Sequence, residues 1–119
     1  MPTKLRLEEG VQTLPVMRVS RGAFASEKYT EVRRLIEELA VPLIPALKKL
    51  SGLLYYYAAV DRATSTVVNI SLWTDLDTAK QMETLGPMLA QRPILERAGV
   101  RFEPIANYET LWNIDSPTK

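Results

Sequence analysis

The chain of 119 residues contains no cysteine and no histidine. Without cysteine this chain has no disulfide, thiolate metal site, iron–sulfur cluster or cysteine nucleophile. Without histidine it has no imidazole general base, no proximal histidine for a haem and no Ser-His-Asp triad. Any catalysis must therefore use carboxylates, amides, Tyr, Lys or Arg, or reactivity that the substrate itself supplies.

Two further absences concern location and partners. Residues Met1–Gln12 lack an apolar signal core, and no apolar run approaches the roughly 20 residues of a membrane span. With 15 basic and 14 acidic residues the formal net charge is +1, so no bulk charge points to a nucleic acid or an anionic membrane. We therefore expect a cytoplasmic protein that binds neither nucleic acid nor membrane.

The residues that are present indicate a folded globular chain. Hydrophobic residues make up 46% and charged residues 24%, which is too apolar for a disordered segment. The length fits one domain. We predict a loosely held N-terminal arm over residues 1–13 and a single domain over residues 14–119.

The spacing of apolar residues predicts the element order β-α-β-β-α-β. The predicted strands are Leu14–Ser20, Leu53–Val60, Thr66–Trp73 and a last segment, Val100–Ile114, which Pro104 divides. This order is the ferredoxin-like α+β arrangement, with a four-stranded antiparallel sheet and two helices on one face.

Proline and glycine predict where the helices end. The first helix begins after Ser26, its predicted N-cap, and Pro42 and Pro45 should break it near Ala40. The second begins after Asp75, which caps it. Gly86-Pro87 should interrupt this helix, and a last helical turn over Pro93–Ala98 should end at Gly99.

The hairpin strands carry apolar side chains on both faces. We expect Val68, Ile70 and Leu72 to pack under the helices. The remaining face would then carry Tyr55, Tyr57, Asn69 and Trp73. An exposed patch of this kind usually marks an interface or a ligand groove, and a two-fold dimer needs only one self-complementary surface. We therefore predict a homodimer that buries more than about 1,000 Å² in total through this face.

Three short segments carry a family resemblance. They are Val16–Ser20, Tyr55–Arg62, whose Val60-Asp61-Arg62 leads into the hairpin turn, and Ile70-Ser71-Leu72-Trp73 followed by Asp75 and Ala79. Over Leu14–Ile114 the chain resembles the antibiotic-biosynthesis-monooxygenase-like domains of the dimeric α+β barrel superfamily. The resemblance implies two sheets joined face to face in a barrel, with a small-molecule pocket in each subunit.

The resemblance also implies a chemistry. Asn69 and Trp73 stand four residues apart on one strand, so both side chains point to the same face. Members of the resembled family use an Asn and a Trp at this spacing to oxidise polyketide phenols and anthrones with molecular oxygen, without flavin, metal or haem. By this resemblance Asn69 would bind the substrate oxygen, and Trp73 would line the pocket with its indole N–H as a donor.

Neighbouring residues complete the predicted site. Arg18 alternates with Met17 and Val19, so it can share the cavity and stabilise an anion. Tyr55 and Tyr57 are predicted as substrate-binding wall or proton-relay groups. The haem-dependent branches of the superfamily are excluded, because they rely on a histidine that this chain lacks.

Structural roles remain open for each of these residues. Trp73 would then be a packing residue, Asn69 a polar contact within the barrel, and Arg18 an ion-pair partner at an interface. Two other functions also remain open. One is a catalytically silent ligand-binding or stress-related dimer, and the other is a cyclase or isomerase, for which Glu109 is the first carboxylate to test.

Overall fold

A computed structural model of the protein describes residues 14–114, so the predicted arm over residues 1–13 lies outside the described residues, as do residues 115–119. The strands are β1 (Val16–Ala23), β2 (Leu53–Asp61), β3 (Thr66–Trp73), β4 (Arg101–Phe102) and β5 (Ala106–Glu109). The helices are α2 (Tyr29–Lys48), α3 (Leu76–Ala79) and α4 (Gly86–Arg97), with 3-10 turns η1 (Ser26–Lys28) and η2 (Lys80–Glu83). None of these helices is long and apolar enough to cross a membrane.

The strands form one antiparallel sheet in the order β2-β3-β1-β4. Along the edge of β1 that faces away from β3, β4 pairs with Gly22–Ala23 and β5 pairs with Val16–Val19. The last predicted strand is therefore present in two pieces, with Pro104 in the gap between them as predicted. The α+β, ferredoxin-like prediction is confirmed.

The prediction that prolines break the first helix is wrong. Helix α2 runs through both Pro42 and Pro45, although each proline removes one backbone hydrogen bond. Leu43 and Leu47, on the same turns, are both buried against the sheet. The packing of these two side chains offsets the lost hydrogen bonds and keeps the helix continuous.

The second helical region also differs in part from the prediction. Helix α3 begins after Asp75 as predicted, and the Thr78 backbone N–H donates to the Asp75 carboxylate at 2.9 Å. Pro87 does not interrupt a helix but stands in the first turn of α4, where a missing N–H costs nothing. The predicted last turn from Pro93 is therefore too short. Gly99, with φ +105°, follows the helix as predicted.

The face of the sheet under the helices consists of four rows of paired residues. Apolar rows lie at the two ends, Val60–Val67–Gly22 and Leu53–Trp73–Val16, and two rows with polar side chains lie between them, Ala58–Asn69–Ser20 and Tyr56–Ser71–Arg18. We call the middle two the polar rows. Since helices pack on apolar surface, the two ends of this face hold the helices more strongly than its middle does.

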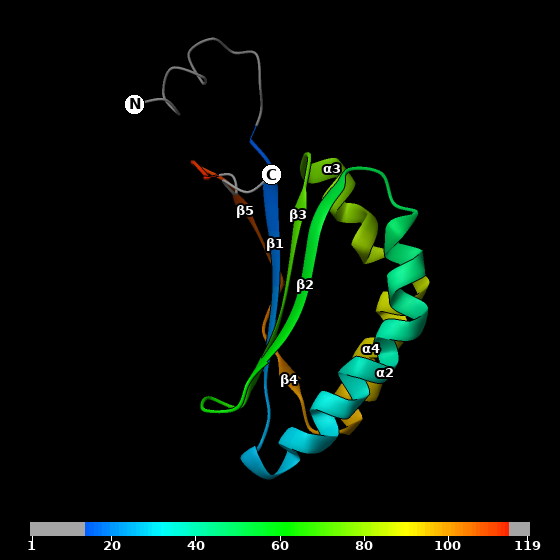
Figure 1. The fold of residues 1–119 in the computed structure, drawn as a ribbon, viewed down its shortest axis with the longest axis vertical. Helices are drawn as coiled ribbons and strands as arrows, with labels where there is room; N and C mark the ends of the chain where they lie inside the picture. Colours follow the sequence, from blue (N-terminus) through cyan, green and yellow to red (C-terminus); the bar gives the residue numbers. More distant parts are fainter. Residues whose placement is uncertain (1–13, 115–119) are drawn as a thin grey trace.

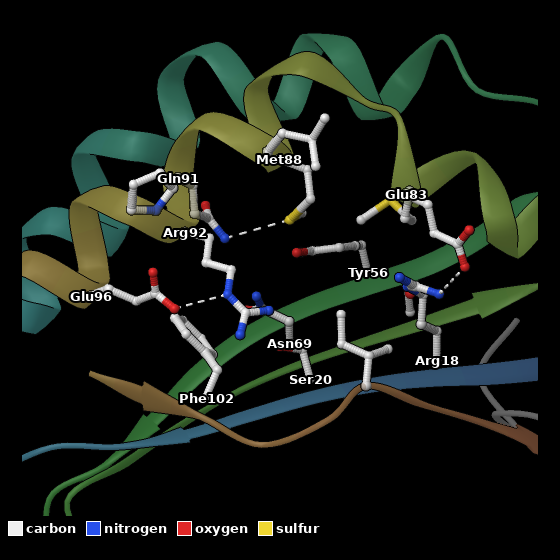
Figure 2. Close-up of a pocket in the computed structure, with 15 residues that line it drawn as sticks. Arg18, Ser20, Tyr56, Asn69, Glu83, Met88, Gln91, Arg92, Glu96 and Phe102 are labelled. Atoms are coloured by element: carbon white, nitrogen blue, oxygen red, sulfur yellow. Dashed lines mark hydrogen bonds and ion pairs between the residues drawn. The ribbon is translucent and has the colours of Figure 1, made fainter.

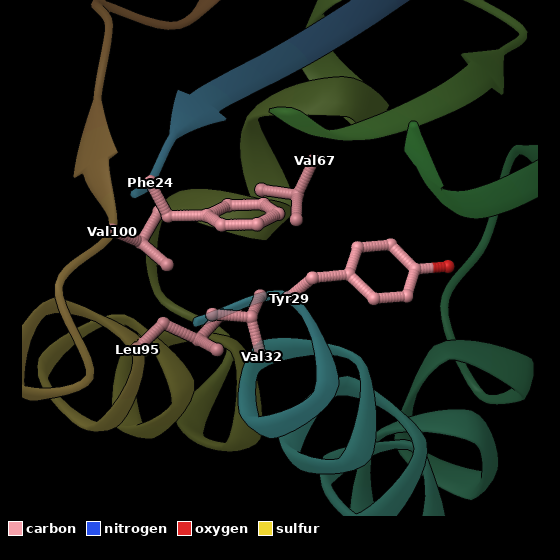
Figure 3. Packing of buried hydrophobic residues seen from close by; sticks show 6 residues of the cluster. All are labelled: Phe24, Tyr29, Val32, Val67, Leu95 and Val100. Atoms are coloured by element: carbon pink, nitrogen blue, oxygen red, sulfur yellow. The ribbon is translucent and has the colours of Figure 1, made fainter. Parts of the chain in front are cut away.

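The hydrophobic core is divided accordingly. The first core cluster consists of Phe24, Tyr29, Val32, Val67, Leu95 and Val100 (Figure 3). The second consists of Leu43, Leu47, Trp73, Ala79 and Met82. Helix α2 contributes residues to both clusters. It is therefore anchored to the sheet near each of its ends, and its middle part passes over the polar rows.

Both long helices lie on one side of the sheet, and no described helix covers the other side (Figure 1). We call that side the outer face. Its side chains are largely apolar and include Met17, Val19, Tyr55, Tyr57, Val68, Ile70, Leu72 and Tyr108. Exposed apolar area of this extent is unusual for a surface that faces only water.

The predicted assignment of the two faces is right for Tyr55 and Tyr57, which lie away from the helices, and wrong for the residues of β3. A bulge in β2 after Leu53 shifts its register, so that Tyr55 pairs with Leu72 and Tyr57 with Ile70. The tyrosines and the branched residues of β3 therefore share the outer face, while Asn69 and Trp73 lie under the helices. The bulge reverses the alternation of β2 relative to β3, and the burial of Val67 and Trp73 in the two core clusters decides which face of β3 lies under the helices.

Candidate functional site

A cavity of about 460 Å³ lies between the polar rows and helix α4 (Figure 2). We call it the α4 cavity. Its polar lining residues are Arg18, Ser20, Tyr56, Asn69, Ser71, Glu83, Gln91, Arg92 and Glu96. Its apolar lining residues are Met82, Met88, Leu89, Pro93, Phe102 and Ile105. The size and the mixture of apolar walls with a few polar groups are typical of a small-molecule site.

Arg18 supplies a buried cation at the end of this cavity. The residue is only 8% exposed, and β1 directs its side chain under the helices. Its Nη1 atom donates to Asn107 Oδ1 at 3.4 Å and lies 3.9 Å from Glu83 Oε2, and both distances are long. Burial lowers the pKa of Arg18, and the Glu83 carboxylate and Tyr56 offset part of that shift. A buried cation with such weak partners favours an anionic ligand.

Tyr56 supplies a buried hydroxyl with no partner among the described residues. It pairs with Ser71 across the sheet, and Figure 2 shows its ring extending into the space between the sheet and α4. Burial raises the pKa of the Tyr56 phenol far above its usual value of 10.0, while the Arg18 cation counteracts this in part. Tyr56 is therefore neutral and available as a hydrogen-bond donor to a ligand.

Asn69 and Trp73 share one face of β3, as their spacing predicts, but their surroundings differ. Asn69 lines the α4 cavity. Trp73 is fully buried in the second core cluster and does not line the cavity. Its indole Nε1 donates to Ser71 Oγ at 2.8 Å. Because the Ser71 hydroxyl already accepts from the indole, its own proton is free to point elsewhere, and Ser71 does line the cavity.

Carboxylates also line the cavity, at its more exposed side. Glu83 lies near Arg18, and Glu96 accepts from Arg92 Nε at 3.0 Å. The Arg92 guanidinium carbon also lies 5.2 Å from the centre of the Phe102 ring. Glu109, the carboxylate proposed first from the sequence, is exposed at the end of β5 and does not line the cavity. Among residues 14–114, no group of three acidic side chains is placed to hold a metal ion.

A second cavity of about 390 Å³ lies beneath helix α2, and we call it the α2 cavity. Four residues line both cavities, namely Tyr56, Asn69, Gln91 and Phe102. The remaining lining of the α2 cavity is apolar except for Lys48. The space above the polar rows therefore has a polar part under α4 and an apolar part under α2.

The structure brings some predicted site residues together and separates others. Arg18 and Asn69 meet in the α4 cavity. Tyr55 and Tyr57 lie on the outer face with exposures of 55% and 61%, and they line neither cavity.

Sequence reasoning missed other residues that line the α4 cavity. They are Tyr56, Ser71, Glu83, Gln91 and Glu96. Alternation with Asn69 was a signal for Ser71, since residues two apart on a strand share a face. No local pattern could identify the helix residues of this set.

The Trp73→Phe substitution tests whether the indole has a structural role. It removes buried volume and the hydrogen bond to Ser71, so we expect the free energy of unfolding to fall by about 2 kcal/mol. The control is Val41→Ala, because Val41 is 75% exposed on helix α2, away from the outer face, and its truncation should cost less than about 0.5 kcal/mol. Urea unfolding followed by far-ultraviolet circular dichroism measures both. Equal losses in the two variants would contradict the placement of Trp73.

The Tyr56→Phe substitution tests the unpartnered hydroxyl. At pH 7 we expect stability to be unchanged or higher, because a buried hydroxyl without a partner is removed. Since the folded-state pKa of Tyr56 is raised above 10.0, the wild-type protein loses stability as the pH rises beyond that value, where only the unfolded chain ionises.

Tyr56→Phe should reduce this alkaline loss relative to the wild-type protein. Thermal melts from pH 7 to pH 11 give both curves. An alkaline loss that is identical in wild type and Tyr56→Phe would show that the phenol is not buried as described.

The sequence matches no protein-family model and no curated protein. Solved structures do match the fold. A proposed antibiotic biosynthesis monooxygenase from Deinococcus radiodurans superposes with a TM-score of 0.65 at 18% identity, over 85% of this chain and 97% of that one. A variant of SnoaB, a cofactor-independent oxygenase from Streptomyces nogalater, superposes with a TM-score of 0.62 at 18% identity, over 86% and 98% of the two chains.

A conserved protein from Methanosarcina mazei has the same fold, with a TM-score of 0.63 at 19% identity over 82% of this chain and 93% of that one. Each match covers nearly the whole of the other protein, so the similarity extends to the complete domain. The chain therefore has the same fold as these solved structures, whose descriptions include antibiotic biosynthesis monooxygenases and a cofactor-independent oxygenase.

Proposed function

We propose that the protein is a homodimer that binds a small aromatic molecule with an acidic hydroxyl in the α4 cavity. The observation that carries this proposal is the buried Arg18 guanidinium, whose polar contacts within residues 14–114 are the long ones to Asn107 and Glu83. A phenolate or enolate oxygen beside Arg18 would supply the missing negative charge. The apolar walls from Met82, Met88 and other residues would cover the ring.

The chemistry that best fits this site is oxidation by molecular oxygen without a cofactor. An electron-rich phenol or anthrone loses a proton and then supplies the electrons that reduce oxygen. One oxygen atom is bonded to the oxidised carbon, and the other leaves as water with two hydrogens of the substrate. An anthrone gives both hydrogens from its methylene carbon, whereas a phenol gives one from the ring carbon and one from its hydroxyl. The protein need only bind the anion, orient it and exclude water.

Each residue of the cavity floor has a role in this proposal. Arg18 stabilises the oxyanion, and the Asn69 amide and Tyr56 hydroxyl donate to its oxygen. Trp73 is a positioning residue, because it contacts Ser71 rather than the cavity. The structural neighbour described as a cofactor-independent oxygenase supports this reaction class.

A second candidate function is isomerisation or cyclisation, and the position of Glu83 favours it. Its carboxylate borders the cavity near Arg18, where it could remove a proton from a bound substrate. This reaction would consume no oxygen. Oxygen uptake therefore separates the two reactions, and binding without turnover would indicate a ligand-binding module.

Dimerisation is proposed from the outer face. Its apolar side chains are continuous across β1, β2, β3 and β5, and Tyr55 and Tyr57 stand side by side with ring centres 6.4 Å apart. Beyond β5, Leu111, Trp112 and Ile114 are also exposed, by 73%, 63% and 82%. A second copy of the chain would cover this surface in the manner of two facing sheets.

We predict that sedimentation equilibrium gives about twice the chain mass of 13.4 kDa at micromolar concentration. Tyr57→Asp places a charge on the outer face and should convert the protein to a monomer. Val41→Asp is the matched control, because Val41 is 75% exposed on the helix side and its replacement should leave the dimer intact. A wild-type monomer, or a dimer that tolerates Tyr57→Asp, would contradict the proposed interface.

Asn69→Ala tests the catalytic proposal. We predict that turnover of an anthrone or hydroquinone, measured as oxygen uptake, falls by about a hundredfold, as for the loss of one oxyanion donor. The melting temperature should change little. Asn113→Ala is the control, because it makes the same chemical change at a residue that lines neither cavity. A stable Asn69→Ala variant with full activity would rule out the catalytic role of this amide.

A further inference from the structure

The α2 cavity differs chemically from the α4 cavity that adjoins it. Besides the four shared residues, its walls are Ile36, Ala40, Leu43, Ile44, Leu47, Lys48, Leu53, Ala58, Val67 and Leu95. Water in a cavity needs two to four polar partners, and these walls offer almost none. An apolar group is therefore the occupant that this space suits best.

The position of the α2 cavity follows from the divided core. Val67 and Leu95 belong to the first core cluster, and Leu43 and Leu47 to the second. All four border the α2 cavity, which therefore lies between the two clusters. Its apolar walls come from α2, α4 and the sheet. In a continuous core these side chains would contact one another and leave no cavity.

The two cavities meet at a defined place. Tyr56, Asn69, Gln91 and Phe102 line both of them, so a molecule in one cavity contacts the same side chains as a molecule in the other. Gln91 is buried, and its amide donates to the weak acceptor Met88 Sδ at 3.6 Å. The Tyr56 hydroxyl, without a partner among the described residues, lies at the same junction. Weakly held polar groups at this point can turn to let a ligand pass between them.

From this arrangement we infer that the ligand is amphipathic: its acidic ring lies in the α4 cavity near Arg18, and an unbranched alkyl substituent on the ring extends past Tyr56 into the α2 cavity. This inference rests on the proposed function, because it takes the acidic ring and its place near Arg18 from there. It adds the second half of the ligand and the residues that select it. Ala40 and Ala58 are the small residues whose size leaves room for the chain.

The test uses a series of 4-n-alkylphenols from methyl to hexyl, with affinities measured by isothermal titration calorimetry. In the wild-type protein each added methylene should tighten binding by up to about fourfold, the value for full burial of one methylene. In Ala40→Leu the longer side chain occupies the α2 cavity, so this gain should stop after the first carbons. The affinity of 4-methylphenol should stay within about twofold of wild type.

Two further variants control for misfolding and for effects of added apolar surface outside the cavity. Val41→Leu adds the same kind of apolar surface one residue away but on the exposed side of α2, and it should keep the full chain-length dependence. Ala58→Leu fills the α2 cavity from the sheet and should repeat the effect of Ala40→Leu. Both cavity-filling variants should melt at or above the wild-type temperature without ligand, since they occupy space rather than displace atoms.

The possible results separate the two claims. Binding of 4-methylphenol that Arg18→Met weakens, with no gain from longer chains, overturns this inference and leaves the proposed site standing. A chain-length gain that persists in both Ala40→Leu and Ala58→Leu also overturns it. Failure of 4-methylphenol to bind, or binding that Arg18→Met does not change, overturns the proposed function and this inference with it.

Discussion

The polar rows of the sheet are the constraint on which the rest of the structure depends. Arg18, Ser20, Asn69 and Ser71 lie in the middle of a face that would normally be the apolar floor of the core. Helices gain little by packing on such groups, and burying them without partners costs free energy. The apolar rows at each end therefore hold α2 and α4, and the cavities lie between.

The same constraint relates the two faces of the sheet. Polar residues point toward the helices, and the alternating positions send Val19, Val68, Ile70 and Leu72 to the outer face. A single copy thus has polar groups in the middle of its inner face and apolar side chains on the outer face of the same strands. The proposed dimer accounts for the apolar outer face, because the sheet of a second copy would cover it. The proposed ligand accounts for the polar rows, because an acidic molecule would complement them.

The sequence predicts the fold well because element order depends on local patterns. Alternation, helical spacing and the Asp75 cap each fix one segment, and Pro104 divides the last strand where expected. The continuity of α2 through Pro42 and the reversal of faces after Leu53 were not predictable, because tertiary packing decides both. Candidate site residues on β1 and β3 can be predicted from strand alternation. Those on α4 and η2 cannot, because only the tertiary packing of these helices brings them to the cavity.

The most direct test of the account is whether the cavity binds a phenol as its anion. The probe is 4-nitrophenol, titrated with protein at a pH where the free phenol is mostly protonated, and the phenolate absorbance reports ionisation. The buried Arg18 cation should lower the pKa of the bound phenol, so phenolate absorbance should rise as protein is added. The rise should disappear in Arg18→Met. Binding without ionisation, or the same rise in the variant, would contradict the central claim.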